Sequence, residues 1–222
     1  MISYSFIFDP NNKVDFVIDE NGCTSNIFQQ ESIQDWMKLE FEQCDECTIP
    51  KGSRETCPAA VAIQPVISVS DAFYSFDKVL VIVKRSDLNL EASTTTQRAI
   101  RSLIGLLLGL SECPLYKLLR PMAYFHLPFG NIDHRVFRIL GTSLIYQYIR
   151  NLDGQTPDWE LNGLRETLKK FHQVNKKLSR RIRTVCQKDA TTNAIALFDL
   201  MVDKVEIALE NNLKQFKPFF EF

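Results

Sequence analysis

The spacing of apolar residues changes once along this chain, and the change limits the folds open to it. Before residue 94, apolar and polar residues alternate in short runs such as residues 2–8 and 14–18, and turn-forming residues separate these runs. This pattern is typical of half-buried strands joined in hairpins. From residue 94 onward apolar residues recur every three or four positions, as they do in helices that pack on a core. The sequence therefore predicts an α+β fold.

The two patterns predict an N-terminal half, residues 1–93, and a C-terminal half, residues 94–222, packed as one compact unit. The first half is expected to be antiparallel and β-rich and to carry a cysteine loop. The second is expected to be a bundle of about four helices. The expected elements are hairpins at 2–18 and 79–90, a short strand at 36–41, a helix starting at Pro58, a long loop at 111–131, helices at 94–110, 134–150, 164–185 and 191–212, and a phenylalanine-rich C-terminus that folds back on the core.

Four cysteines are the strongest chemical signal in the sequence. Cys44 and Cys47 form a CxxC pair, Cys57 follows soon after, and Cys113 lies farther along; the last two each precede a proline. A CxxC pair has the shortest spacing at which two thiolates can turn toward one tetrahedral ion. The four cysteines therefore predict a metal site. Two further cysteines, at positions 23 and 186, have no cysteine nearby in sequence and are expected to be small buried side chains.

The cysteine spacing leaves the kind of metal open. Four-cysteine zinc sites usually combine two CxxC pairs, whereas here one pair is joined by two single cysteines. Irregular spacing and a proline after a ligand cysteine are also features of iron–sulfur ligation. The sequence predicts one metal centre, zinc or a [4Fe–4S] cluster, with a structural, sensory or electron-transfer role. Thiol redox chemistry and the absence of a site are the alternatives.

Charge is distributed unevenly, although the formal net charge is only −1. Residues 1–57 carry eleven acidic and four basic side chains, whereas residues 165–188 carry nine basic and one acidic. This asymmetry indicates an anionic partner for the 165–188 helix, attraction between the two halves of the chain, or a solvated helix face. An adaptor or nucleic-acid-associated function through this helix is the alternative to metal binding, although aromatic residues for base stacking are almost absent from it.

No catalytic motif is found, so the sequence leaves enzymatic activity undecided. It has no phosphate-binding glycine loop, nucleophile elbow, HExxH helix or dinucleotide fingerprint. The segment 113–129 combines Lys117, Arg120 and His126 in a proline-stiffened loop, a mixture that can bind a phosphate or carboxylate group. The alternative is a structural loop in which His126 satisfies a buried backbone group.

The sequence favours a cytoplasmic protein without a membrane partner. No N-terminal segment combines the basic, apolar and small-residue regions of a signal peptide. The most apolar window, residues 104–110, is far shorter than the roughly 20 residues needed to cross a bilayer. In the cytoplasm the cysteines would remain reduced and able to bind metal.

The cysteines and the proline-rich loop together resemble a known family. The motif residues are Leu39-Glu40-Phe41 before the CxxC pair, Cys57-Pro58, Cys113-Pro114, Leu119-Arg120-Pro121-Met122 and Phe125-His126-Leu127-Pro128-Phe129. They are similar to a family of uncharacterised bacterial proteins of about this length, a domain of unknown function. The resemblance covers most of the chain and implies a bacterial cytoplasmic origin but no activity. It also suggests that the cysteines and the 120–129 loop belong to one site.

Overall fold

The computed structural model describes residues 1–19, 22–26 and 32–221, and within them the fold is α+β, as predicted. One antiparallel sheet has the strand order β3-β2-β1-β4-β5. Its strands are β1 (Ile2–Asp9), β2 (Asn12–Asp19), β3 (Gly22–Ser25), β4 (Lys78–Arg85) and β5 (Leu88–Thr95). Both predicted hairpins are therefore present, and the two meet where β1 pairs with β4.

One face of the sheet is apolar and carries helices. Tyr4 of β1 lies opposite Phe16 of β2 and Val83 of β4, and all three are buried. Every second residue of the three central strands is buried in this way, because successive side chains of a strand point to opposite faces. Helices α1 (Pro58–Ser70) and α2 (Thr96–Leu110) contact the sheet, α1 at β3 and α2 at β3, β4 and β5.

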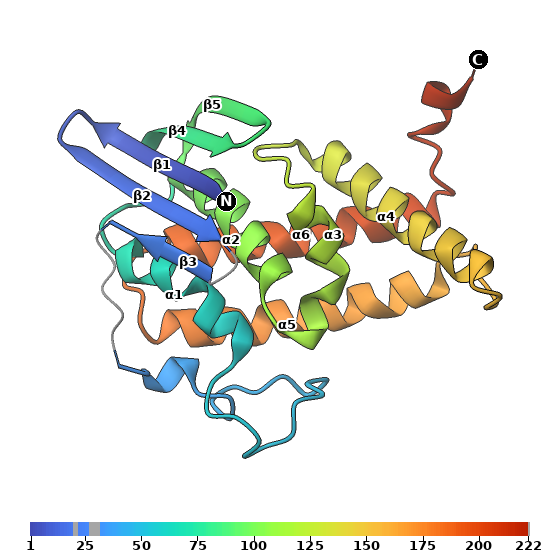
Figure 1. Ribbon diagram of the computed structural model, residues 1–222, viewed down its shortest axis with the longest axis horizontal. Coiled ribbons are helices and arrows are strands. Elements are labelled where there is room, and N and C mark those ends of the chain that lie inside the picture. The colour runs from blue at the N-terminus through green and yellow to red at the C-terminus, as the bar shows by residue number, and fades with distance from the viewer. Residues whose placement is uncertain (20–21, 27–31, 222) are drawn as a thin grey trace.

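The remaining helices form most of the C-terminal half (Figure 1). They are α3 (Arg120–Tyr124), α4 (Ile132–Leu152), α5 (Asn162–Arg183) and α6 (Ala190–Glu210), with short 3₁₀ helices η1 (Asp35–Met37), η2 (Pro114–Leu119) and η3 (Lys217–Phe220). Helix α5 buries Leu168, Phe171 and Val174, which follow the predicted helical spacing. It packs on α6, which in turn packs on α2.

A close approach of α2 and α3 places the segment that contains Cys113. A Cβ atom at Gly109 would lie 2.8 Å from the Cβ of Ala123 and 2.9 Å from the carbonyl oxygen of Leu119. Glycine is therefore required at this position, because any side chain would push η2 and α3 away from α2. The contact makes the chain return along α2 immediately after residue 113.

Several local predictions were wrong. In place of the expected strand at 36–41, the structure has the 3₁₀ helix η1 followed by a single bridge between Lys38 and Thr56. Trp36 and Met37 are both buried, whereas adjacent residues of a strand face opposite sides of the sheet. The short strand β3 lies in a segment expected to be irregular. The expected loop at 111–131 contains η2 and α3.

The C-terminus folds back on the core less than predicted. Phe216 is buried and lies 5.5 Å, centroid to centroid, from Phe137 of α4, but Phe219 and Phe220 are 74% and 59% exposed. The chain changes direction after α6 at Asn212 and Leu213, which both have positive φ. Figure 1 shows the last residues leaving the helical body. Phe222 lies outside the described residues.

Among the described residues, no single helix combines the length and apolar character of a membrane span. Only α2 taken together with the segment Pro114–Tyr124 meets both conditions, and this pair is bent by 110°.

Candidate metal centre

The structure brings the four predicted cysteines together around one cavity of about 20 Å³. Cys113 is buried, and Cys44, Cys47 and Cys57 are half-buried. The other lining residues are apolar except for Gln43 and Arg181; they are Leu39, Ile49, Pro58, Ala59, Leu115, Val174 and Leu178. Cys23 and Cys186 do not line this cavity. Three separate segments, the 39–57 loop, the start of α1 and the start of η2, therefore supply thiols to one place.

The two Cys-Pro pairs position their thiols in the same way. Cys57 is the N-cap of α1 and Cys113 the N-cap of η2, and each helix begins at the following proline. A residue before proline is driven to extended backbone, and the two cysteines have nearly equal angles, φ −76° and ψ 121° at Cys57 and φ −66° and ψ 119° at Cys113. Proline is tolerated at the first helical position because its missing N–H needs no partner there. The cysteine-proline order thus fixes the backbone that carries each of these thiols before any ion binds.

The CxxC pair lies on a loop that is closed at its base by backbone hydrogen bonds. The N–H of Leu39 donates to the carbonyl of Glu55 at 2.8 Å, and the N–H of Cys57 donates to the carbonyl of Met37 at 2.7 Å. Within the loop, the N–H of Cys47 donates to the carbonyl of Cys44 at 3.0 Å, which forms a tight turn. This turn points both thiols of the pair toward the same cavity.

The thiols are spaced more widely than the ligands of a single ion. Among the described residues, one group of three or more potential ligands has all its donor atoms within 4.8 Å of one another, and it consists of His172, Asp203 and Glu206 on the surface of α5 and α6. The cysteines form no such group. A zinc–sulfur distance of about 2.3 Å places tetrahedral thiolates only about 3.8 Å apart.

Arg181 is a buried cation beside the four thiols. Its side chain is 2% exposed, and it donates to the carbonyls of Trp36 and Lys38, both at 2.7 Å, and of Leu39 at 3.0 Å. Its guanidinium also lies 5.8 Å from the ring centroid of Phe41. These partners are neutral, and no carboxylate of the described residues lies within 4.0 Å of it. A buried charge is costly without a counter-charge, and the thiols are the groups nearby that can become anions.

Burial and the nearby cysteines keep the thiols of Cys44 and Cys113 protonated. Burial raises the pKa of the Cys44 thiol to about 12, the negative charges of Cys57, Cys113 and Cys47 add to this rise, and Arg181 opposes it. Burial likewise raises the pKa of Cys113 to about 11, against hydrogen bonds from the backbone of Leu115 and Tyr116. Metal binding would displace these protons, because the ligand is the thiolate.

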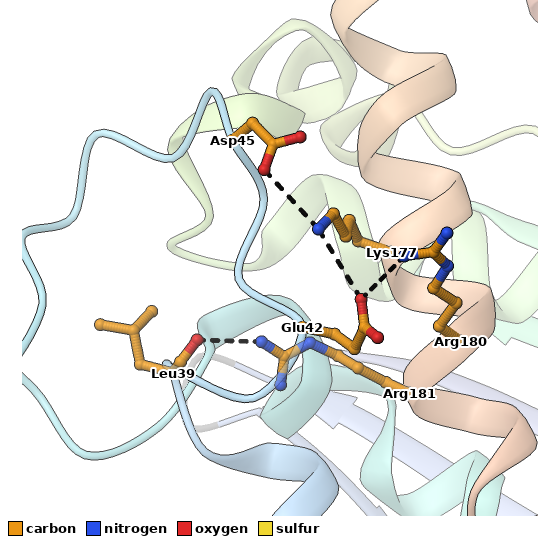
Figure 2. Close-up of polar contacts among 6 residues, drawn as sticks. All are labelled: Leu39, Glu42, Asp45, Lys177, Arg180 and Arg181. Atoms are coloured by element: carbon orange, nitrogen blue, oxygen red, sulfur yellow. Dashed lines mark hydrogen bonds and ion pairs between the residues drawn. The ribbon is translucent and has the colours of Figure 1, made fainter.

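Ion pairs fasten the cysteine loop to α5 (Figure 2). Glu42 lies between Lys177 and Arg180, at 3.7 and 3.3 Å, and Asp45 lies 3.6 Å from Lys177. About two turns earlier on α5, Lys170 lies 3.9 Å from Glu46. Attraction between the acidic and the basic part of the chain is thus present in the fold. An adaptor or nucleic-acid-associated role would depend on the basic side chains that remain exposed, among them Lys169, Lys176 and Arg183.

The predicted anion-binding set is not brought together. Lys117 and Arg120 are exposed, and Arg120 lies 5.9 Å from the ring centroid of Tyr124. His126 is half-buried, its Nε2 is hydrogen-bonded to the hydroxyl of Tyr4, and it lines a second cavity that includes neither Lys117 nor Arg120. Its carbonyl accepts from Arg85 at 2.9 Å.

His126 makes stability depend on pH. Burial, followed by the charges of Arg138, Arg135 and Arg85, lowers its pKa to about 3. Between pH 6.5 and pH 3 the unfolded chain therefore binds a proton that the folded chain does not, so the free energy of unfolding decreases as pH falls through this range. We expect a loss of about 3 kcal/mol near pH 3. Urea unfolding from pH 7 to pH 3 should show a shallower decrease in the variant His126→Gln, whereas His134→Gln, at an exposed histidine, should follow the wild type.

A family model supports the resemblance noted in the sequence. The model described as Domain of unknown function (DUF6901) matches residues 2–221. The chain belongs to the DUF6901 family. No curated protein and no solved structure matches it. Family membership therefore assigns no activity to the chain. A bacterial origin is an expectation, and so is a cysteine pattern shared across DUF6901.

Arg181 is the residue that sequence reasoning missed. It is one of the nine basic residues of the 165–188 segment, yet in this DUF6901 chain it is buried beside the cysteine cavity. The signal was its position, because it lies three residues after Leu178 and one before Ile182, within the apolar stripe of α5. A charged residue in such a stripe indicates a specific buried partner.

Proposed function

We propose that Cys44, Cys47, Cys57 and Cys113 bind one metal centre, and that this centre joins the cysteine loop to the helical half of the protein. The observation that carries the proposal is the buried guanidinium of Arg181, which has only neutral hydrogen-bond partners and lines the same cavity as the four thiols. Four thiolates around a dication leave a net negative charge, and Arg181 offsets part of it. A set of neutral thiols would leave this charge uncompensated.

The thiol spacing and the cavity size point to different centres: the spacing suits a [4Fe–4S] cluster, whereas a cavity of about 20 Å³ has room for a single ion such as zinc. Each thiolate of such a cluster binds a different iron atom, so its ligands are farther apart than the four ligands of one ion. The backbone N–H groups of Leu115 and Tyr116 oppose the rise in the pKa of the Cys113 thiol, and N–H groups that favour a thiolate in this way also influence the reduction potential of such clusters. The apolar walls restrict the access of water.

The segments that the proposed metal centre would join indicate that it stabilises the structure. Apart from the hydrogen bonds at its base and those from Arg181, the 39–57 loop depends on short turns and on ion pairs between exposed or half-buried side chains, which contribute little. A metal centre would tie this loop to the starts of α1 and η2. The core of a chain of 222 residues can fold without metal, so we expect the ion to stabilise the loop and its surroundings rather than to create the fold.

The test is the absorption spectrum and metal content of the full chain purified without oxygen. A brown protein with a broad band near ~400 nm that is bleached by dithionite, and about four iron atoms per chain, would identify a [4Fe–4S] cluster. A colourless protein that contains one zinc per chain, released when the thiols are modified, would identify zinc. Purified protein with neither metal, which also takes up neither from iron and sulfide or from zinc, would contradict the proposal.

A further inference from the structure

We propose that a second cavity, lined by Arg101, Arg135 and Arg138, binds a phosphate group. The cavity has a volume of about 50 Å³ and shares no lining residue with the cysteine cavity. This is several times the roughly 10–15 Å³ that one water needs by the same measure. Its walls come from α2, α4, α6 and the 119–127 segment, so the inference does not depend on the metal centre.

The three arginines line one cavity without a carboxylate partner among the described residues. In the described part of the chain none of them forms an ion pair with aspartate or glutamate. All three are half-buried, and the exposed Arg98 adds a fourth positive charge nearby. Like charges gathered where water is partly excluded repel each other strongly. The fold therefore holds an excess of positive charge that an anion would neutralise.

The same surroundings lower the pKa of all three guanidinium groups. Burial, then the charge of Arg101, lowers the pKa of Arg135 to about 10. Burial also lowers the pKa of Arg101 and of Arg138. No carboxylate contributes to any of these shifts.

The guanidinium groups are held in place and still have N–H groups to offer. Arg135 donates through Nε to the carbonyl of Gly130 at 3.0 Å, and Arg138 donates through Nη2 to the carbonyl of Met122 at 3.2 Å. The Nε of Arg101 is buried and has no hydrogen-bond partner among the described residues. A guanidinium has five N–H donors in a planar fork that matches the oxygens of phosphate. An oxyanion in the cavity would satisfy the unused donor of Arg101.

Phosphate suits this site better than a carboxylate. Near pH 7 a phosphate group carries close to two negative charges and presents three acceptor oxygens, whereas a carboxylate carries one charge and two oxygens. Ser102, whose hydroxyl lies 3.0 Å from that of Tyr4, adds a neutral hydrogen-bonding group to the lining. The remaining lining residues are His126, Gly105 and the apolar side chains of Leu119, Met122, Leu127, Phe198 and Met201. The apolar side chains strengthen ionic hydrogen bonds by reducing contact with water.

Calorimetric titration of the full chain with inorganic phosphate, at low and constant ionic strength, tests the proposal. We expect one phosphate per chain and at least a tenfold weaker affinity in Arg101→Gln, because the variant removes charge-assisted hydrogen bonds worth about that factor or more. Arg183→Gln makes the same change of charge at an exposed position of α5, and it should bind phosphate as the wild type does. A parallel titration with phenyl phosphate shows whether the site takes a free phosphate ion or a phosphate group on a larger molecule. Tight binding of either ligand supports the site.

Thermal unfolding separates ligand binding from a structural role of the arginine. A hundredfold excess of phosphate over its Kd should raise the Tm of the wild type by about 5 °C, and that of Arg101→Gln much less. Without phosphate the variant should unfold at the same temperature as the wild type or higher, because a repelling charge is gone. A lower Tm of the free variant, with an unchanged response to phosphate, would identify Arg101 as structural and overturn the proposal. So would the absence of phosphate binding to the wild type, an equal loss in Arg183→Gln, or tighter binding of malonate than of phosphate.

Discussion

The variant Cys113→Ser is expected to lose the metal centre and to unfold at a much lower temperature. Serine is a poor ligand for zinc and for iron–sulfur clusters, and binding free energy lost from the native state is lost from the free energy of unfolding. With Cys113 absent, η2 is no longer tied to the cysteine loop. We expect a destabilisation of about 5 kcal/mol and a decrease in Tm of about 10 °C or more, measured by calorimetry alongside metal content.

The control for this change is Cys186→Ser. Cys186 is half-buried and its sulfur lies 3.1 Å from the hydroxyl of Ser70, outside the cysteine cavity, so this variant should keep its metal. Limited proteolysis gives a local readout, because Lys51 and Arg54 lie in the exposed part of the loop. Trypsin should cleave there faster in Cys113→Ser than in the wild type or the control. Equal metal content and equal cleavage in both variants would rule out Cys113 as a ligand.

The second large effect is expected for Arg181→Met. Methionine fills much of the arginine volume but leaves the carbonyls of Trp36, Lys38 and Leu39 without their donors. Each buried acceptor left unpaired costs about 1–3 kcal/mol, so we expect a loss of about 4 kcal/mol in the free energy of unfolding, measured with urea. The variant should also bind metal more weakly, because the charge that offsets the thiolates is absent.

Two further variants test whether the loss of stability comes from removing the buried guanidinium. Arg183→Met, two residues away on the exposed face of α5, should change stability by less than about 0.5 kcal/mol. Glu42→Gln removes the ion pairs to Lys177 and Arg180 seen in Figure 2, and it should cost less than about 1 kcal/mol and less still at high salt. If Glu42→Gln proved as damaging as Arg181→Met, the exposed ion pairs rather than the buried guanidinium would hold the loop.

Local spacing predicted much of the fold and the identity of the cysteine set. The apolar period that Leu168, Phe171 and Val174 share is a property of a single helix, so it can be recognised without knowing what the helix contacts. Cys57-Pro58 could be placed at a helix start for a similar reason, since the constraint acts within three residues. These features depend only on neighbours in the sequence.

The features that sequence reasoning missed depend on contacts between distant segments. Cys113 reaches the cysteine loop because Gly109 allows α3 to lie close to α2, and this contact has no local signature. The arginine cavity joins positions 101, 135 and 138 from two helices, and only the i,i+3 pair on α4 is a pattern within one element. The short helix η1 replaced a predicted strand because burial of two adjacent side chains, decided by tertiary packing, overrode the weak alternation.

The similar backbone angles at the two Cys-Pro pairs indicate an order in which the thiols of the proposed centre come into place. Cys57 and Cys113 stand at helix starts in the folded core, whereas Cys44 and Cys47 lie on a loop held by backbone hydrogen bonds at its base and by ion pairs to α5. If the proposed centre forms, half of its donor set is in place once the chain has folded, and the other half depends on ionic contacts that salt weakens.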